Sequence, residues 1–297
     1  MASDAFVTAM RYCLSICGAV ALVENLLVMA VFAGTKKLRV KYYTFIFNLA
    51  LSDFAFGLFI ILVTWIDSPV LQGLLTASYY VSILTILAAA VNRYLALSIM
   101  PAARYDSLVT ACRLVGACLV IWCLCLTYGQ LLYNVFTTGV SRALEVYGYS
   151  VAVLVVWVVT ALTYFLAFRK VKHLSPALLS PAGFGADIRQ TRRLLVVFIL
   201  ILVTAFISWM PYAVLSLIAY YNPSLLDKPA FSESFEVAVL IYAFSTVANP
   251  LIYWWRLDSF RAGFYTMFCR CFMKAESRQT EVDPSANREN PVVETDF

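Results

Sequence analysis

Two carboxylic acids, Glu24 and Asp53, stand inside long apolar runs of the sequence. A charged side chain at the centre of a bilayer costs roughly 2.5–3.5 kcal/mol on insertion scales, so each acid requires a function or a partner. Asn249 and Pro250 place a polar group and a helix breaker in a third apolar run. Because proline bends a helix and frees a backbone carbonyl, this pattern predicts room for water or an ion beside a carboxylate.

The sequence contains no recognisable pair of nucleophile and base for enzyme catalysis. The single histidine, His173, lies in a polar segment, and no nucleophile can be matched to it as a base. We therefore do not expect an enzyme.

The composition predicts a membrane protein. Hydrophobic residues make up 62% and charged residues 13% of the 297 residues, against roughly 45–50% and 25% in soluble domains. About 20 apolar residues span a bilayer. Five uncharged runs reach that length, and two more do so if one buried acid is tolerated in each. The fold class that we expect is an all-α membrane protein, a bundle of seven transmembrane helices at residues 12–33, 42–66, 68–92, 114–136, 147–168, 194–221 and 237–255.

The distribution of basic residues predicts the orientation in the cell membrane. Short cytoplasmic loops hold an excess of Lys and Arg. With the N-terminus outside, only Arg11, Arg142 and Lys228 of the 22 basic residues fall in extracellular segments, which leaves 22 − 3 = 19 on the cytoplasmic side. We therefore expect a multi-pass protein with an extracellular N-terminus and a cytoplasmic C-terminus. The basic excess is explained by topology, so nucleic acid is not an expected partner.

The segment after the last span predicts a short amphipathic eighth helix. Within residues 256–272, Leu257, Phe260 and Phe264 have helical spacing, and Arg261 lies opposite them. Such a helix lies in the membrane interface against lipid. We expect residues 1–272 to form the membrane domain with this helix. Residues 273–297, which are polar and poor in aromatic residues, are expected to be a disordered tail.

Two features of the tail predict modification or binding. Cys269 and Cys271 stand at the end of the amphipathic helix, where palmitoylation would anchor it; unmodified thiols are the alternative. The last residues, from Thr295 to Phe297, fit the Ser/Thr-x-apolar terminus that PDZ domains bind.

Six short motifs occur in order, each on the expected span: Asn25 in ENLLV, Asp53 in NLALSD, Asn92-Arg93-Tyr94, Trp122, Ser208-Trp209-Met210-Pro211, and Asn249 to Tyr253 in NPLIY. Over roughly residues 8–272 the chain resembles the rhodopsin-like (class A) G-protein-coupled receptors. In character it is most similar to the melanocortin, adenosine, cannabinoid and lysophospholipid group.

The resemblance implies a sodium site as an allosteric modulator, and no other cofactor. The residues at the family's sodium positions carry oxygen ligands, which suit a hard cation; they are Asp53, Ser82, Ser245, Thr246 and Asn249. A water-filled polar cluster is the alternative.

The resemblance also implies how the protein would couple to a heterotrimeric G-protein, with arrestin as a further partner. Arg93 would meet the G-protein when the sixth span swings outward; a basic residue at the membrane edge is the alternative. The other residues of this switch are Asn92, Tyr94, Tyr164, Asn249, Pro250 and Tyr253. Asn92 stands where the family usually has an acid that restrains the arginine, and the stretch IRQTRRLL around Thr191, where the family's second acid belongs, contains no acid. We therefore expect elevated basal activity.

The residues expected to face a ligand are mostly apolar or aromatic. Leu75 stands where amine receptors have an aspartate, and Ala243 replaces the lysine of light receptors, which excludes an opsin. The expected pocket comprises Leu71, Leu75, Thr76, Tyr79, Tyr212, Ser216, Phe235, Val239 and Tyr242, with Trp209 as a pivot beneath them. This lining suits a small uncharged or lipid-like ligand; ordinary core packing is the alternative. A short loop near residues 67–70 predicts a shallow or open pocket.

A membrane transporter or channel is the alternative from another functional class. Such proteins have paired interrupted helices in two halves, and this sequence has no such pair. We therefore expect a receptor that transmits a small-ligand signal to G-proteins.

Overall fold

The computed structural model describes residues 4–38, 41–99, 102–136, 138–174 and 184–268. Helices account for nearly all of this part of the chain. Their bounds are α1 Asp4–Gly34, α2 Thr44–Trp65, α3 Pro69–Ser98, α4 Ala102–Leu108, α5 Ala111–Asn134, α6 Thr138–Leu174, α7 Phe184–Tyr221, α8 Pro229–Arg256 and α9 Asp258–Phe268, with short 3-10 turns at Lys36–Leu38, Lys41–Tyr43 and Pro223–Asp227.

Seven of these helices are long and apolar enough to cross a membrane. They are α1, α2, α3, α5, α6, α7 and α8. Each predicted span matches one of them and exceeds its bounds by at most two residues, so the all-α seven-helix prediction is confirmed. Several helices continue beyond the uncharged runs. In particular, α6 begins at Thr138, nine residues before the predicted start at Tyr147.

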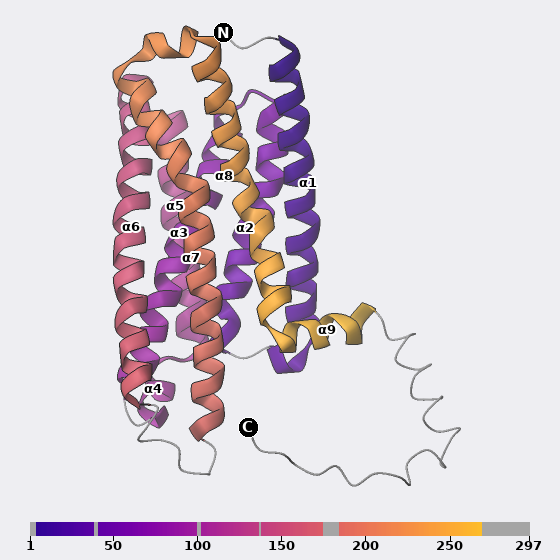
Figure 1. Cartoon of the computed structure of the whole chain (residues 1–297), viewed down its shortest axis with the longest axis vertical. Coiled ribbons are helices and arrows are strands. Elements are labelled where there is room, and N and C mark those ends of the chain that lie inside the picture. The colour runs from indigo at the N-terminus through magenta and orange to yellow at the C-terminus, as the bar shows by residue number, and fades with distance from the viewer. Residues whose placement is uncertain (1–3, 39–40, 100–101, 137, 175–183, 269–297) are drawn as a thin grey trace, which may run out of the picture.

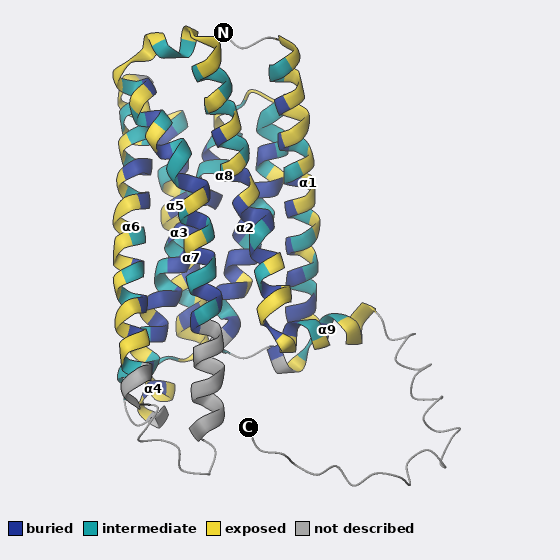
Figure 2. Cartoon of the chain, viewed as in Figure 1, coloured by how far each residue is buried: buried dark blue, intermediate teal, exposed yellow. Residues whose placement is uncertain are grey.

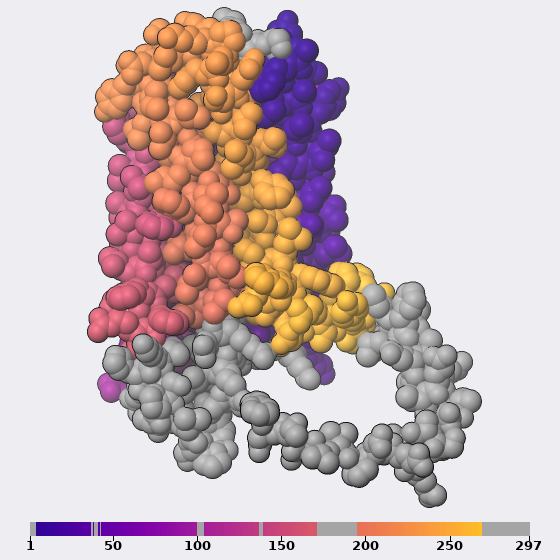
Figure 3. Space-filling view, viewed as in Figure 1, coloured from indigo at the N-terminus to yellow at the C-terminus, as the bar shows by residue number. Residues whose placement is uncertain are grey.

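The long helices stand side by side in an upright bundle (Figure 1). We call the end where α1 begins the upper end and the end beside α9 the lower end. The central helix is α3, which packs against α2, α5, α6 and α7, while α1 packs against α2 and α8. Figure 3 shows side chains filling the spaces between the ribbons of α6, α7 and α8 on one face.

The outer surface of the bundle is apolar, as a lipid-facing surface must be. Exposed residues follow the outward sides of the helices, whereas buried ones face inward (Figure 2). Large exposed side chains include Leu119 and Leu124 on α5, Val155 and Leu162 on α6, and Ile207 on α7. Lipid does not drive such residues inward, so packing depends on close contact between helices.

Two pairs of glycines provide such contact. A Cβ atom added at Gly73 of α3 would lie 2.8 Å from the carbonyl oxygen of Gly129 on α5. A Cβ atom added at Gly18 of α1 would lie 2.8 Å from the carbonyl oxygen of Gly57 on α2. Because glycine lacks Cβ, the backbones of each pair can approach closely. The first pair fixes the upper end of α3 against α5.

The upper ends of α2 and α3 are joined by only three residues, Ile66 to Ser68. Ser68 is extended, and Pro69 occupies the first turn of α3, where its missing N–H leaves no hydrogen bond unmade. This agrees with the short loop that we expected there.

The amphipathic helix α9 lies across the lower end of the bundle (Figure 1). Phe260 is buried and packs against Phe32 of α1, with ring centroids 5.9 Å apart. Arg261 donates to the carbonyl oxygens of Trp254 and Trp255, at 3.1 and 2.9 Å, and thereby caps α8. The predicted helix is therefore confirmed, although Asp258 rather than Arg256 begins it. The expected tail at residues 273–297 lies outside the described residues.

Candidate functional site

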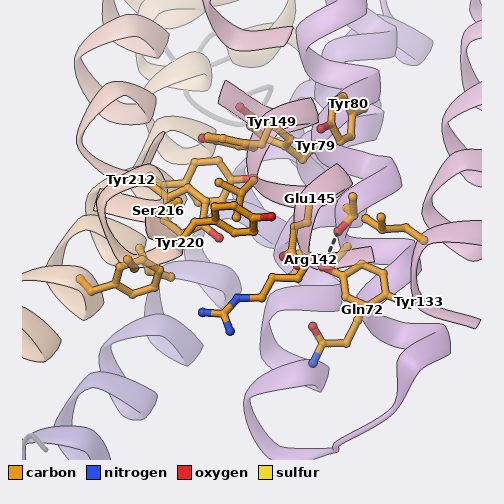
Figure 4. Close-up of a pocket in the computed structure, with 18 of the residues that line it drawn as sticks. Gln72, Tyr79, Tyr80, Tyr133, Arg142, Glu145, Tyr149, Tyr212, Ser216 and Tyr220 are labelled. Carbon is orange, nitrogen blue, oxygen red and sulfur yellow. Dashed lines mark hydrogen bonds between the residues drawn. The ribbon is translucent and has the colours of Figure 1, made fainter. Parts of the chain in front are cut away.

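A cavity of about 340 Å³ opens in the upper half of the bundle. Its walls come from α3, α6, α7 and α8, together with parts of α2 and α5. Ten of the polar and aromatic lining residues are labelled in Figure 4: Gln72, Tyr79, Tyr80, Tyr133, Arg142, Glu145, Tyr149, Tyr212, Ser216 and Tyr220. Thr76, Phe235 and Tyr242 also line the cavity. This volume lies within the usual range for small-molecule sites, roughly 300–1,000 Å³.

Tyrosines form the floor of this upper cavity. The ring of Tyr79 stacks on Tyr149 with centroids 4.9 Å apart and meets Tyr242 edge-on at the same distance. Tyr212 stacks on Tyr242 at 5.6 Å. Several of the hydroxyl groups here, those of Tyr79, Tyr149 and Ser216, are buried without a hydrogen-bond partner among the described residues. The floor thus offers aromatic faces and unsatisfied polar groups to a bound molecule.

One side of the upper cavity carries two charged residues. Tyr133 of α5 donates a 2.7 Å hydrogen bond to Glu145 Oε1 of α6, the dashed line in Figure 4. Thr76 of α3 reaches the Tyr133 oxygen at 3.5 Å. Arg142 lies one turn before Glu145 on α6, and its side chain is exposed at the opening.

A second, much smaller cavity of about 10 Å³ lies beneath the first, around Asp53. Asp53 is only 1% exposed. Ser82 donates to its Oδ1 at 2.8 Å, and Asn249 donates to its Oδ2 at 2.7 Å. Ser245 and Thr246 also line this space and donate their hydroxyl protons to carbonyls of α8. The Ser245 oxygen accepts one bond from the Trp209 indole, which leaves it one lone pair for a further contact. The lower cavity is about large enough for one water molecule or a small ion.

These donors suit a hard cation. Every lining oxygen comes from a carboxylate, a hydroxyl or an amide, which are the ligand types that hard cations prefer. No lysine or arginine forms an ion pair with Asp53 within the described ranges. The five residues predicted as sodium ligands therefore lie together around one space, while Glu24 is half-buried on α1 and does not line it.

Three aromatic residues connect the two cavities. Tyr79 and Tyr242 line both of them. Trp209 lies against Tyr79, with centroids 5.2 Å apart, and its indole N–H donates to Ser245 at 3.0 Å. Pro211 lies inside α7 two residues later. A molecule in the upper cavity would thus contact the rings that cover the Asp53 cluster.

Two asparagines make further polar contacts near this cluster. Asn25 of α1 donates to the carbonyl oxygen of Thr246 at 3.1 Å. Asn48 of α2 donates to Thr85 at 2.7 Å and accepts from the Trp122 indole at 3.0 Å. The motifs on α1, α2, α5 and α8 are therefore joined by hydrogen bonds around the lower cavity.

The lower end of α3 presents the arginine motif. Arg93 is 1% exposed, and Tyr164 of α6 is close enough to interact with it electrostatically. Asn92 accepts a 2.9 Å hydrogen bond from the Tyr105 hydroxyl of α4. Lys41 fixes the same segment by donating to Asp106 at 2.6 Å and to the carbonyl oxygen of Val109 at 2.9 Å. The sequence did not predict α4 or its bond to Asn92.

Comparison with known proteins identifies the family. Residues 24–253 match the family described as 7 transmembrane receptor (rhodopsin family). The chain belongs to the rhodopsin-like G-protein-coupled receptors. It is therefore a receptor that signals through G-proteins, and it is neither an enzyme nor a transporter or channel.

Individual relatives agree with this assignment. The receptor is 28% identical over 290 residues to galanin receptor 2b of Danio rerio, which covers 86% of this chain and 73% of the relative. It is 26% identical over 267 residues to melanocortin receptor 5 of Sus scrofa, which covers 80% and 86%. Its fold resembles squid rhodopsin with a TM-score of 0.73 at 20% identity, covering 98% and 94% of the two chains.

Most residues that the sequence singled out for the receptor's pocket line the upper cavity. They are Leu75, Thr76, Tyr79, Tyr212, Ser216, Phe235, Val239 and Tyr242. Leu71 is not among the lining residues, and Trp209 lines the lower cavity instead. Tyr94 is half-buried at the lower end, and Pro250 and Tyr253 are buried in α8.

The expectation of an uncharged lining is wrong, because Arg142 and Glu145 line the upper cavity. The sequence predicts Arg142 in an extracellular segment, and the apolar run begins at Tyr147, after Glu145. Because α6 extends upward to Thr138, Arg142 and Glu145 lie on this helix and line the upper cavity. Helical spacing from Tyr149 was the available signal, because residues 142, 145 and 149 share one face of a helix.

Proposed function

We propose that this receptor binds a small ligand in the upper cavity and transmits its presence to a G-protein at the lower end of α3. The observation that carries the proposal is that Tyr79 and Tyr242 line both cavities, while Trp209 bonds to Ser245 between them. A ligand that moves these rings would change the packing around Asp53, and α7 can bend at Pro211. Arg93 would then become accessible to the G-protein.

Guanine-nucleotide exchange tests this coupling. Receptor in lipid nanodiscs should accelerate exchange on at least one member of a panel of heterotrimeric G-proteins. Arg93→Ala should abolish the acceleration, because the residue that engages the G-protein is lost. Arg169→Ala is the control, since Arg169 is an exposed arginine at the same end, over the Phe165 ring. Exchange unaffected by Arg93→Ala would contradict the proposal.

Elevated basal signalling is part of the proposal. Asn92 carries no charge and is held by Tyr105, so the resting state lacks the acid that would attract Arg93. A two-state equilibrium of a few kcal/mol would then lie closer to the active state. Ligand-free signalling should increase with expression level, and Asn92→Asp should lower it. A basal signal that is equal in both proteins would oppose this part.

Sodium is proposed as a modulator at the lower cavity. Asp53, Ser82, Ser245, Thr246 and Asn249 would hold the ion, which would stabilise the inactive packing. Their convergence on one small space supports this assignment. Thermal stability should be higher in sodium than in N-methylglucamine, and Asp53→Asn should remove the difference. Equal stability in both cations would count against the ion.

The apolar and aromatic part of the upper cavity suits the body of the ligand, such as a ring system or a lipid chain. Relatives named for galanin, melanocortin and adenosine show that the family accepts chemically different ligands. We also propose that the upper end, with the N-terminus, faces outward, as the basic residues predict. An epitope tag at the N-terminus should be labelled on intact cells.

The remaining partners concern the C-terminal segment and the lower face. Cys269, Cys271, Thr295 and Phe297 lie outside the described residues, so their roles stay predictions. Palmitoylation should give hydroxylamine-sensitive labelling that Cys269→Ser with Cys271→Ser removes. PDZ capture should be lost on deletion of Phe297. Arrestin recruitment should follow activation and depend on Arg93, since both partners would use the same opened face.

A further inference from the structure

The polar corner of the upper cavity indicates one chemical property of the ligand. Resting on the proposed function of that cavity, we infer that the ligand carries a positively charged nitrogen which binds Glu145. The supporting arrangement is a half-buried carboxylate, one phenol that donates to it, and an aromatic floor. No family motif marks this position on α6, and the usual amine-binding aspartate is replaced by Leu75.

Glu145 has capacity for another hydrogen bond. Its Oε1 accepts a hydrogen bond from Tyr133 at 2.7 Å, and its Oε2 accepts none from the described residues. The side chain points into the cavity in Figure 4. An ionised carboxylate accepts about four hydrogen bonds, so one donor leaves room for an ammonium or guanidinium group. Such a charge-assisted bond is roughly twice as strong as a neutral one.

The tyrosines favour the same kind of ligand. Tyr79, Tyr149, Tyr212 and Tyr242 present ring faces and edges within one cavity. Cations are attracted to aromatic faces within about 6 Å of the ring centroid. The hydroxyls of Tyr79 and Tyr149 are buried and close enough to interact with each other, but neither makes a well-aligned hydrogen bond to a described residue. Each can therefore accept a hydrogen bond from the nitrogen or from its hydrating water. These groups complement a cation better than an anion.

Arg142 is the other charged residue of the lining, and its position limits its influence. It is exposed at the opening, whereas Glu145 is half-buried. Solvent screens an exposed charge much more than a buried one. Arg142 therefore weakens the attraction for a cation without reversing it, and it can contact an acceptor group on the part of the ligand nearest the opening.

Glu145 also joins α5 to α6 through Tyr133, so a structural role must be separated from ligand recognition. Tyr133→Phe removes the hydrogen bond and keeps the charge. Glu145→Gln keeps the shape and the acceptor for Tyr133 but removes the charge. Glu236→Gln removes an acid of α8 that does not line the cavity. Selective loss in Glu145→Gln alone is the signature of charge recognition.

Three probes with the same ring test the inference: 2-(2-naphthyl)ethylamine, 2-(2-naphthyl)ethanol and 3-(2-naphthyl)propanoic acid. Their affinities are measured by surface plasmon resonance on receptor in nanodiscs. The amine should bind at least about tenfold more tightly than the alcohol, because a charge-assisted bond replaces a neutral one, and the acid should bind weakest. Glu145→Gln should remove the preference, whereas Tyr133→Phe and Glu236→Gln should retain it.

Equal affinity for amine and alcohol, or a preference that survives Glu145→Gln, would overturn the inference. Nucleotide exchange, measured separately, tests the proposed function. Exchange that depends on Arg93 without amine selectivity would refute only the inference. Amine selectivity without any exchange would support the inference and contradict the coupling.

Discussion

The two cavities of the receptor differ in how their polar groups are satisfied. Around Asp53, both carboxylate oxygens accept hydrogen bonds, and the hydroxyls of Ser245 and Thr246 donate to helix carbonyls. In the upper cavity, Tyr79, Tyr149 and Ser216 have buried hydroxyls without partners in the described part of the chain. Unsatisfied buried groups cost free energy that a bound molecule can recover. The lower cavity is therefore ordered by its own hydrogen bonds and leaves room only for a water molecule or a small ion, whereas the upper cavity leaves polar groups for a larger ligand.

The largest predicted effect on stability concerns the close backbone contact between α3 and α5 beside the upper cavity. Gly129→Leu should lower the free energy of unfolding by about 3 kcal/mol or more, because its side chain would meet the Gly73 backbone. Denaturant titration of purified receptor measures the change. Gly116→Leu on the same helix is the control, since nothing lies within 4 Å of a Cβ atom there. Equal losses in both variants would show that the close contact is unimportant.

Two serine substitutions test the comparison directly. Ser82→Ala should cost about 1.5–3 kcal/mol of stability, because it removes a hydrogen bond to the buried Asp53 carboxylate. Ser216→Ala should change stability by less than about 0.5 kcal/mol, since its hydroxyl makes no well-aligned hydrogen bond to any residue that the structure describes. Thermal and denaturant unfolding of both variants decides the matter. Similar costs would mean that the two cavities are equally ordered.

The connection between the cavities should have a smaller effect. Trp209→Phe removes the indole N–H that donates to Ser245, at a cost of about 1 kcal/mol. Trp157→Phe is the control, because the Trp157 indole N–H is buried without a partner among the described residues and packs only through its ring, on Phe206. Unfolding measurements should rank Trp209→Phe as the more destabilising change. The reverse ranking would weaken the proposed connection.

The smallest effect is expected at the polar corner of the upper cavity. Tyr133→Phe should lower stability by about 0.5–1 kcal/mol, since the bond to Glu145 lies near solvent and its acceptor can be hydrated. The measurement is the shift in the midpoint of thermal unfolding. If Tyr133→Phe lowered stability as much as Ser82→Ala, the hydrogen bonds of the two cavities would contribute equally to stability, and the proposed difference between the cavities would be wrong.

The lower cavity could be predicted from the sequence because its residues belong to motifs with fixed helical spacing. Asn25, Asp53 and Asn249 each show which face of their helix points into the bundle. When the inward faces of two neighbouring helices are known, the side chains that lie close to each other can be predicted. The motif residues on α3 and α8 follow from the same inward faces. Packing between helices did not have to be known in detail.

The upper cavity could be predicted only in part. Tyr79, Tyr212 and Tyr242 lie within apolar runs whose inward faces are defined by the same motifs. Glu145 and Tyr133 lie where helix ends extend beyond those runs, and their meeting depends on the tilt and length of α5 and α6. Similarly, the bond between Tyr105 and Asn92 depends on a short helix that apolar periodicity does not mark. Features set by tertiary packing at helix ends were therefore missed.

The short connection between α2 and α3 restricts how the upper cavity can admit a molecule. The four peptide steps from Trp65 to Pro69 reach at most about 14 Å even when fully extended. The upper ends of α2 and α3 therefore cannot move far apart. The contact between Gly73 of α3 and Gly129 of α5 restricts this side of the cavity further. Any widening of the opening for an entering molecule should therefore come from α6, α7 or α8. Ligand residence time should accordingly respond to changes in the Pro223–Asp227 turn, which joins α7 to α8.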